Sequence, residues 1–134
     1  MYRDIGRPLD LIVGDVTVLA RAAVRALRLG DPIPARLSVA LGSLAGATDA
    51  LAARIGAVED HPEVTAPALE AVVLASELVP TGHSLSLSVL IAYTQATAAD
   101  LLRALGVDRD PAHERVGRAA QTATERVAHE AAVR

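Results

Sequence analysis

The chain has 134 residues, a net charge of −3 and no cysteine, and 51% of its residues are hydrophobic. This length suits one domain with its own core, and the lack of cysteine excludes a disulfide scaffold and a thiolate metal site. Phe and Trp are absent, which, together with the mildly acidic charge, argues against nucleic acid or anionic lipid as the main partner.

The first predicted helix covers residues 9–29, because Pro8 suits its first turn and Gly30 its end. Asp15 falls among apolar positions, so it either lies exposed at a contact edge or pairs with a basic residue of a neighbour. We expect the broad apolar face of this helix to be buried. Its residues are Leu9, Ile12, Val13, Val16, Leu19, Ala20, Ala23 and Leu27.

A stiff Asp-Pro-Ile-Pro connection at residues 31–34 precedes a second predicted helix over residues 35–57. Its apolar residues alternate at steps of four and three, a spacing typical of antiparallel packing. Gly42 and Gly46 predict a close approach, by another helix of the same chain in preference to a dimer partner. The expected interaction seam comprises Leu37, Leu41, Gly42, Gly46 and Leu51.

The polar segment over residues 59–67 is the best candidate for a flexible loop. A third helix is expected over residues 67–79, with Thr65 as a possible cap, and Pro80 and Gly82 end it. A final helix is expected over residues 111–133, capped by Asp110, with a small and mostly alanine inward face.

The central helix is expected over residues 84–105. Ser84, Ser86 and Ser88 alternate with apolar residues as in a half-buried strand, but the apolar pattern continues for about six turns, which is too long for a strand. Ser84 suits an N-cap and Gly106 a terminator. The sequence thus predicts an all-α fold, an antiparallel bundle of about five helices in a single domain over residues 1–134.

A membrane span is not expected. The longest run without charged residues, residues 78–99, is interrupted by Pro80 and Gly82, and the remaining stretch is shorter than the roughly 20 apolar residues that a span needs. The N-terminus does not resemble a signal peptide. These observations favour a soluble, cytoplasmic protein.

No catalytic motif stands out, and no cofactor or metal site is expected. The four histidines, which are His61, His83, His113 and His129, are expected at the surface. Residues 81–84 combine free helix amides with His83 and so offer an anion site as an alternative to a simple turn.

Tyr93 and Asp100 are seven residues apart and therefore share one side of the central helix. With Ser86, and possible help from His83, they form the candidate ligand-binding set, a polar wall for a small amphipathic molecule. The alternative is that Tyr93 covers a packed core and that Asp100 pairs with a nearby arginine.

Residues 84–108 also resemble a segment of a known family. A serine-rich start, a run of small aliphatics and then Asp-Leu-Leu-Arg-Ala-x-Gly resemble the soluble cytoplasmic helical part of the fusaric-acid-resistance-type, or aromatic acid exporter, family. Tyr93 and Gln95 depart from that pattern, and the family's membrane-spanning half has no counterpart here. The matching residues are Leu85, Ser86, Val89, Leu90, Ala98, Asp100, Leu101, Leu102, Arg103, Ala104 and Gly106.

Three functions follow as hypotheses. The resemblance implies a non-enzymatic, transport-associated helical domain that assembles with itself, as a homo-oligomer, or with a membrane transport protein. The alternative is a free-standing binder or regulator of a small molecule such as an aromatic carboxylate. An enzyme has the least support, because no paired titratable groups can be assigned.

Overall fold

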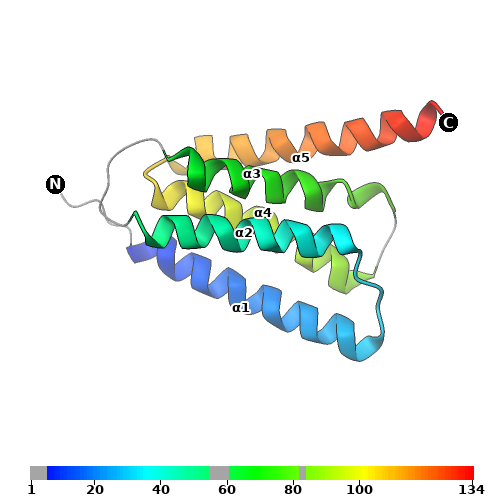
Figure 1. Cartoon of the computed structure of the whole chain (residues 1–134), viewed down its shortest axis with the longest axis horizontal. Helices are drawn as coiled ribbons and strands as arrows, with labels where there is room; N and C mark the ends of the chain where they lie inside the picture. Colours follow the sequence, from blue (N-terminus) through cyan, green and yellow to red (C-terminus); the bar gives the residue numbers. More distant parts are fainter. Residues whose placement is uncertain (1–5, 55–60, 82–83) are drawn as a thin grey trace.

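The computed structural model describes residues 6–54, 61–81 and 84–134, and within them it is an all-α bundle with no strand. The helices run antiparallel to their sequence neighbours (Figure 1). They are α1 (Gly6–Leu29), α2 (Ala35–Ala52), α3 (Pro62–Ser76), α4 (Leu85–Ala104) and α5 (Arg109–Ala132), with a short 3₁₀ turn η1 (Val79–Thr81) after α3. The predicted fold class is confirmed.

α4 is the central helix of the bundle. α1 packs along α4, α2 packs along α3, and α3 and α5 contact both α4 and each other. The core lies between these helices and is built from small and medium side chains; its largest fully buried aliphatic residues are Leu37, Val64, Val72, Leu90, Leu101 and Leu102. Among the described helices α1 packs extensively on α4 alone, so a large part of its surface stays exposed.

The ends of α4 match the sequence prediction. The Ser84 hydroxyl accepts a hydrogen bond from the Leu87 amide at 3.2 Å, as an N-cap does. Gly106 has a φ of 92° and accommodates the turn after the helix, a conformation that costs glycine little. Ser84 and Gly106 therefore fix the length of the central helix locally.

The start of α3 was predicted wrongly. The helix begins at Pro62, not at Pro67, so most of the expected loop is helical and Thr65 lies inside the helix, not at its cap. Pro62 stands in the first turn, where its missing amide costs nothing. Val64 and Ala68 are fully buried and extend the core stripe of α3 toward its N-terminus. The burial of Val64 and Ala68 thus stabilises a helix in a segment whose polar residues and Pro67 favour a turn when they are considered alone.

The expected inward face of α1 is also partly wrong. α1 buries Pro8, Ile12, Leu19, Ala22 and Ala26 against the rest of the bundle. Other apolar residues that were expected inside are exposed, with accessible fractions of 66% for Val13, 46% for Val16 and 70% for Leu27. The reason is geometric, because contact with one helix covers only a narrow stripe of a cylinder.

The glycine pair on α2 does not meet another helix among the described residues. A Cβ placed on Gly42 or Gly46 would have no neighbouring atom within 4 Å, so both glycines face open space. Leu37 and Leu51 of the same expected seam are buried in the core, and Leu41 is half-buried. The seam therefore divides, with its leucines facing inward and its glycines facing outward.

The last helix differs from its prediction mainly at its start. α5 begins at Arg109, with Asp108 and not Asp110 at the N-cap position. Its buried residues are Ala112, Val116 and Ala123, which are small, as expected. α5 can therefore lie close to α3 and α4, and most of its polar side chains remain in solvent.

Candidate functional sites

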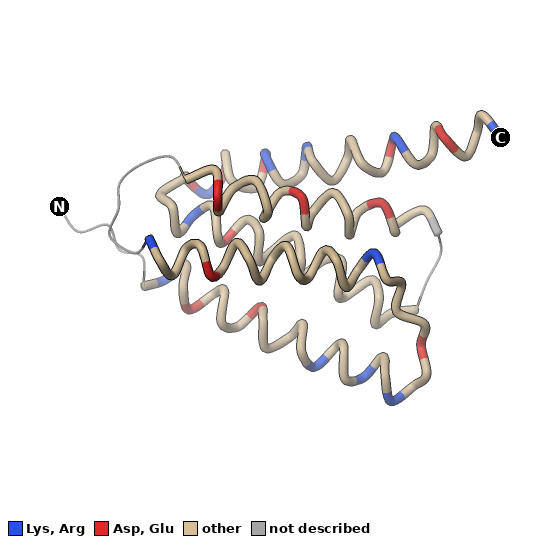
Figure 2. Tube along the Cα trace, in the orientation of Figure 1, with Lys and Arg blue, Asp and Glu red and all other residues tan. Residues whose placement is uncertain are grey.

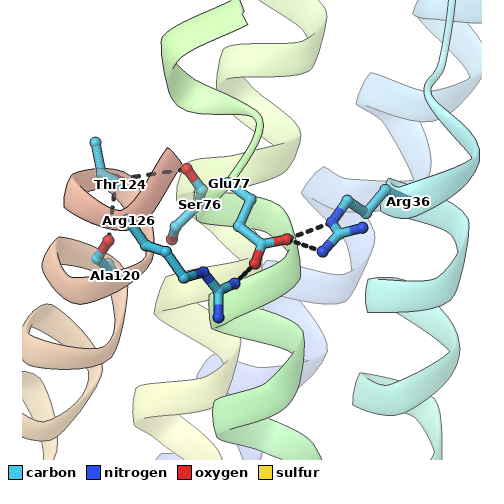
Figure 3. Close-up of polar contacts among 6 residues, drawn as sticks. All are labelled: Arg36, Ser76, Glu77, Ala120, Thr124 and Arg126. Atoms are coloured by element: carbon cyan, nitrogen blue, oxygen red, sulfur yellow. Dashed lines mark hydrogen bonds and ion pairs between the residues drawn. The ribbon is translucent and has the colours of Figure 1, made fainter. Parts of the chain in front are cut away.

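A buried glutamate joins three helices at one end of the bundle. Glu77 follows α3 directly, and its side chain lies between Arg36 of α2 and Arg126 of α5, both of which form ion pairs with it (Figure 3). The Glu77 side chain is only 5% exposed, whereas both arginines are about half exposed. Each carboxylate oxygen therefore has its own guanidinium partner, which compensates for the burial of the charge.

Further hydrogen bonds surround this cluster. The Gln95 side-chain amide donates to the Ser76 hydroxyl at 3.1 Å, and the Thr124 hydroxyl donates to the Ser76 carbonyl at 3.4 Å. These bonds attach the end of α3 to α4 and α5. The arrangement holds the end of α3 against α2, α4 and α5 and is therefore structural. The sequence analysis missed it because Arg36, Glu77 and Arg126 are far apart in the chain.

A pair of acidic residues lies where α1 meets α4. Asp15 lies in the same stripe of α1 as the buried Ile12 and Leu19. Its Oδ2 atom is buried and has no hydrogen-bond partner in the described chain. Burial, followed by the hydrogen-bond contact and the negative charge of Asp100, raises the pKa of Asp15 from 3.8 to about 6. Two carboxyl groups can share a hydrogen bond only when one of them holds a proton. A protonated Asp15 can therefore donate to Asp100, whereas two ionised carboxylates cannot form this bond.

The neighbour of Asp15 is thus an acid, so the alternative in which Asp15 pairs with a basic residue is wrong. The other alternative, an exposed acid at a contact edge, is also wrong, because Asp15 is half-buried and its Oδ2 atom is buried. Asp100 is itself bound by Arg103, one turn along α4, at 3.2 Å, as one of the sequence alternatives proposed. Within the described part of the chain no basic side chain pairs with Asp15, so above its pKa its negative charge is uncompensated there. We therefore expect the contact between α1 and α4 to weaken as the pH rises.

Asp15→Asn should make the fold more stable at pH 7.5 by about 1 kcal/mol, after discounting for partial exposure. Between pH 3.8 and about 6 the folded chain keeps a proton that the unfolded chain has lost, so stability falls as the pH rises through this window. The gain from Asn should therefore shrink as the pH approaches 4. Urea unfolding at several pH values measures this, with Asp49→Asn, at an exposed aspartate of α2, as the control; an equal gain for both variants would contradict the role of burial.

The predicted ligand residues do not surround one cavity. Ser86 is buried and lines a small groove between α1 and α4, Asp100 is buried beside Arg103 and Asp15, and Tyr93 is half-buried against the core. His83 lies outside the described residues. α1 packs along α4 and reaches both Ser86 and Asp100, so a helix occupies part of the surface that was expected to form a ligand-binding wall.

The groove beside Ser86 has a volume of about 210 Å³ and is also lined by Arg21 and Arg25. These two arginines, with Arg28, belong to a cationic patch at the C-terminal end of α1 (Figure 2). The side chains of all three form no ion pair or hydrogen bond within the described residues. Val24 and Leu29 lie beside them in a second, shallow groove of about 630 Å³.

One histidine departs from the expected surface position. His61 is buried, and its Nδ1 atom lies 3.3 Å from Glu63, which also pairs with Arg54 at 3.1 Å. His113 and His129 are exposed, as expected. Within the described residues no three His, Cys, Asp or Glu side chains gather as metal ligands would.

α4 is long and apolar enough to cross a membrane by length and composition, the one such helix among the described residues. It is also mostly buried inside the bundle, and the core helix of a soluble protein has the same composition.

Comparisons with protein-family models, with curated proteins and with solved structures found no match for this chain.

Proposed function

We propose that this chain is a non-enzymatic helical domain that acts through helix–helix assembly, with itself or with a membrane transport partner. The observation that carries the proposal is the exposed apolar face of α1, with Val13, Val16 and Leu27 in solvent. Contiguous exposed apolar surface on a protein marks an interaction site. The resemblance of residues 84–108 to the cytoplasmic part of aromatic acid exporters supports a transport-associated setting.

Light scattering after gel filtration tests this function on the full chain. We expect an oligomer of defined mass whose population grows with protein concentration. A strict monomer at every concentration would contradict assembly of the chain with itself.

A second candidate function is the binding of a small aromatic carboxylate. Arg21 and Arg25 are unpaired within the described chain and lie with Ser86 and apolar Val18 and Val89 around one groove. A guanidinium binds a carboxylate in two-point fashion, and apolar side chains suit an aromatic ring. The volume of about 210 Å³ limits the site to a small ligand.

Benzoate should raise the melting temperature of the chain if this second function holds. At about 100 times its Kd a ligand that binds only the folded state stabilises it by about 2.7 kcal/mol. Arg25→Gln should abolish most of this shift, whereas Arg7→Gln, at the other end of the same helix, should retain it. A shift that is equal in the two variants, or absent from the wild-type chain, would contradict the site.

A further inference from the structure

We infer that α1 pairs with α1 of a second copy of this chain in an antiparallel, two-fold arrangement. This inference rests on the proposed assembly function and names its partner and geometry. Its basis is a second seam on α1, defined here as Leu9, Val13, Val16, Ala20, Ala23 and Leu27. Four of its six residues are exposed, and only Leu9 and Ala23 are half-buried.

The second seam has the spacing of a coiled-coil interface. Its residues alternate at steps of four and three over the length of α1. Each lies one position, about 100° around the helix, beyond a residue of the stripe that faces α4. α1 therefore has two parallel seams, of which α4 covers one, and α1 makes no comparable contact with any other described helix.

The sizes of the seam residues favour an antiparallel pair. With the two-fold axis near Val18, Leu9 lies opposite Leu27 of the second copy, Val13 opposite Ala23, and Val16 opposite Ala20. Each of the four inner layers then holds one valine and one alanine, which keeps the packing even. A parallel pair in register would instead stack Ala20 on Ala20 and Ala23 on Ala23, leaving two thin layers.

The charges on α1 favour the same direction. The half from Gly6 to Thr17 holds one arginine and two aspartates, whereas the half from Val18 to Leu29 holds three arginines and no acid. An antiparallel pair places the acidic half of each helix against the basic half of the other. Asp10 and Arg28 each follow a seam residue on the same flank, so each Asp10 approaches Arg28 of the second copy. A parallel pair would gather six arginines at one end.

Val16→Glu should weaken the dimer, with at least about a 100-fold increase in its dissociation constant, because each interface would bury two unpaired carboxylates. Val39→Glu is the matched control, since Val39 is 58% exposed on α2 and lies outside the seam. Sedimentation velocity over a range of concentrations measures both, and circular dichroism melting confirms that each variant folds. Equal weakening by both variants would overturn the inference.

The direction of pairing can be tested by cross-linking, because the chain has no cysteine of its own. A mixture of Leu9→Cys and Leu27→Cys chains should form a cross-linked heterodimer with a short bismaleimide, whereas Leu27→Cys alone should not cross-link. Efficient cross-linking of Leu27→Cys with itself would establish a parallel pair and overturn the inference.

The outcomes separate the two proposals. An oligomer that tolerates Val16→Glu, or that does not cross-link through Leu9→Cys and Leu27→Cys, refutes pairing through α1 and leaves assembly standing. A wild-type monomer at every concentration refutes the α1 pair and self-assembly together. A monomer that instead sediments with phosphatidylglycerol vesicles, and loses this with Val16→Glu, refutes the pair and assigns the same face to an anionic membrane surface.

Discussion

Removing both arginines around Glu77, as Arg36→Gln with Arg126→Gln, should lower the free energy of unfolding by about 3–5 kcal/mol. The Glu77 side chain is buried and receives ion pairs from both, one from α2 and one from α5. Without them a buried carboxylate has no cationic partner and must be either neutralised or hydrated, and both processes oppose folding. The contact of α3 with its neighbours should loosen at the same end.

Glu77→Gln is the informative comparison for this double variant. It removes the buried charge itself, and the two arginines, which are about half exposed, can return to water, so we expect a loss of only about 1–2 kcal/mol. Chemical unfolding followed by circular dichroism measures both variants. A double variant no less stable than Glu77→Gln would show that Glu77 does not need its arginines.

The second large effect is expected from Leu101→Ala, with a loss of about 3–5 kcal/mol in the free energy of unfolding. Leu101 is fully buried in α4, the helix that α1, α3 and α5 all contact. Its removal would leave a cavity that the rigid neighbouring backbones fill only in part. Because much of the surrounding core is alanine, few long side chains are able to move into the space.

Leu85→Ala serves as its control. Leu85 belongs to the same helix but is 72% exposed, so the same chemical change should cost less than about 0.5 kcal/mol. Thermal or urea unfolding of both variants gives the comparison. Similar losses from the two leucines would mean that helix propensity, and not burial, dominates the contribution of α4.

The two proposed functions place different demands on α1. Assembly uses the apolar seam of the helix, whereas carboxylate binding uses Arg21 and Arg25, which lie on the other side of the stripe that faces α4, together with Ser86 of α4. Variants on one side therefore leave the other side unchanged. Val16→Glu tests the first function and Arg25→Gln the second, and the pair assigns α1 to one role, to both or to neither.

Local chemistry in the sequence was enough to determine the all-α fold and the ends of its central helix. The N-cap at Ser84, the positive φ at Gly30 and Gly106, and the four-and-three spacing of leucines all act within a few residues of the chain. Such signals need no tertiary partner to take effect. They failed at α3, where the polar residues before Pro67 indicate a loop when read alone, but Val64 and Ala68 are buried in a continuous helical stripe.

Tertiary structure alone decided which faces are covered and which charges meet. The broad apolar face of α1 is compatible with several orientations, and only packing on α4 selects the stripe through Ile12 and Leu19 and leaves Val13, Val16 and Leu27 in water. Asp15 meets Asp100 from 85 positions away, and Glu77, just after α3, is brought together with Arg36 of α2 and Arg126 of α5. Periodicity specifies which residues share a side of a helix, but the partner of that side depends on the simultaneous packing of all the helices.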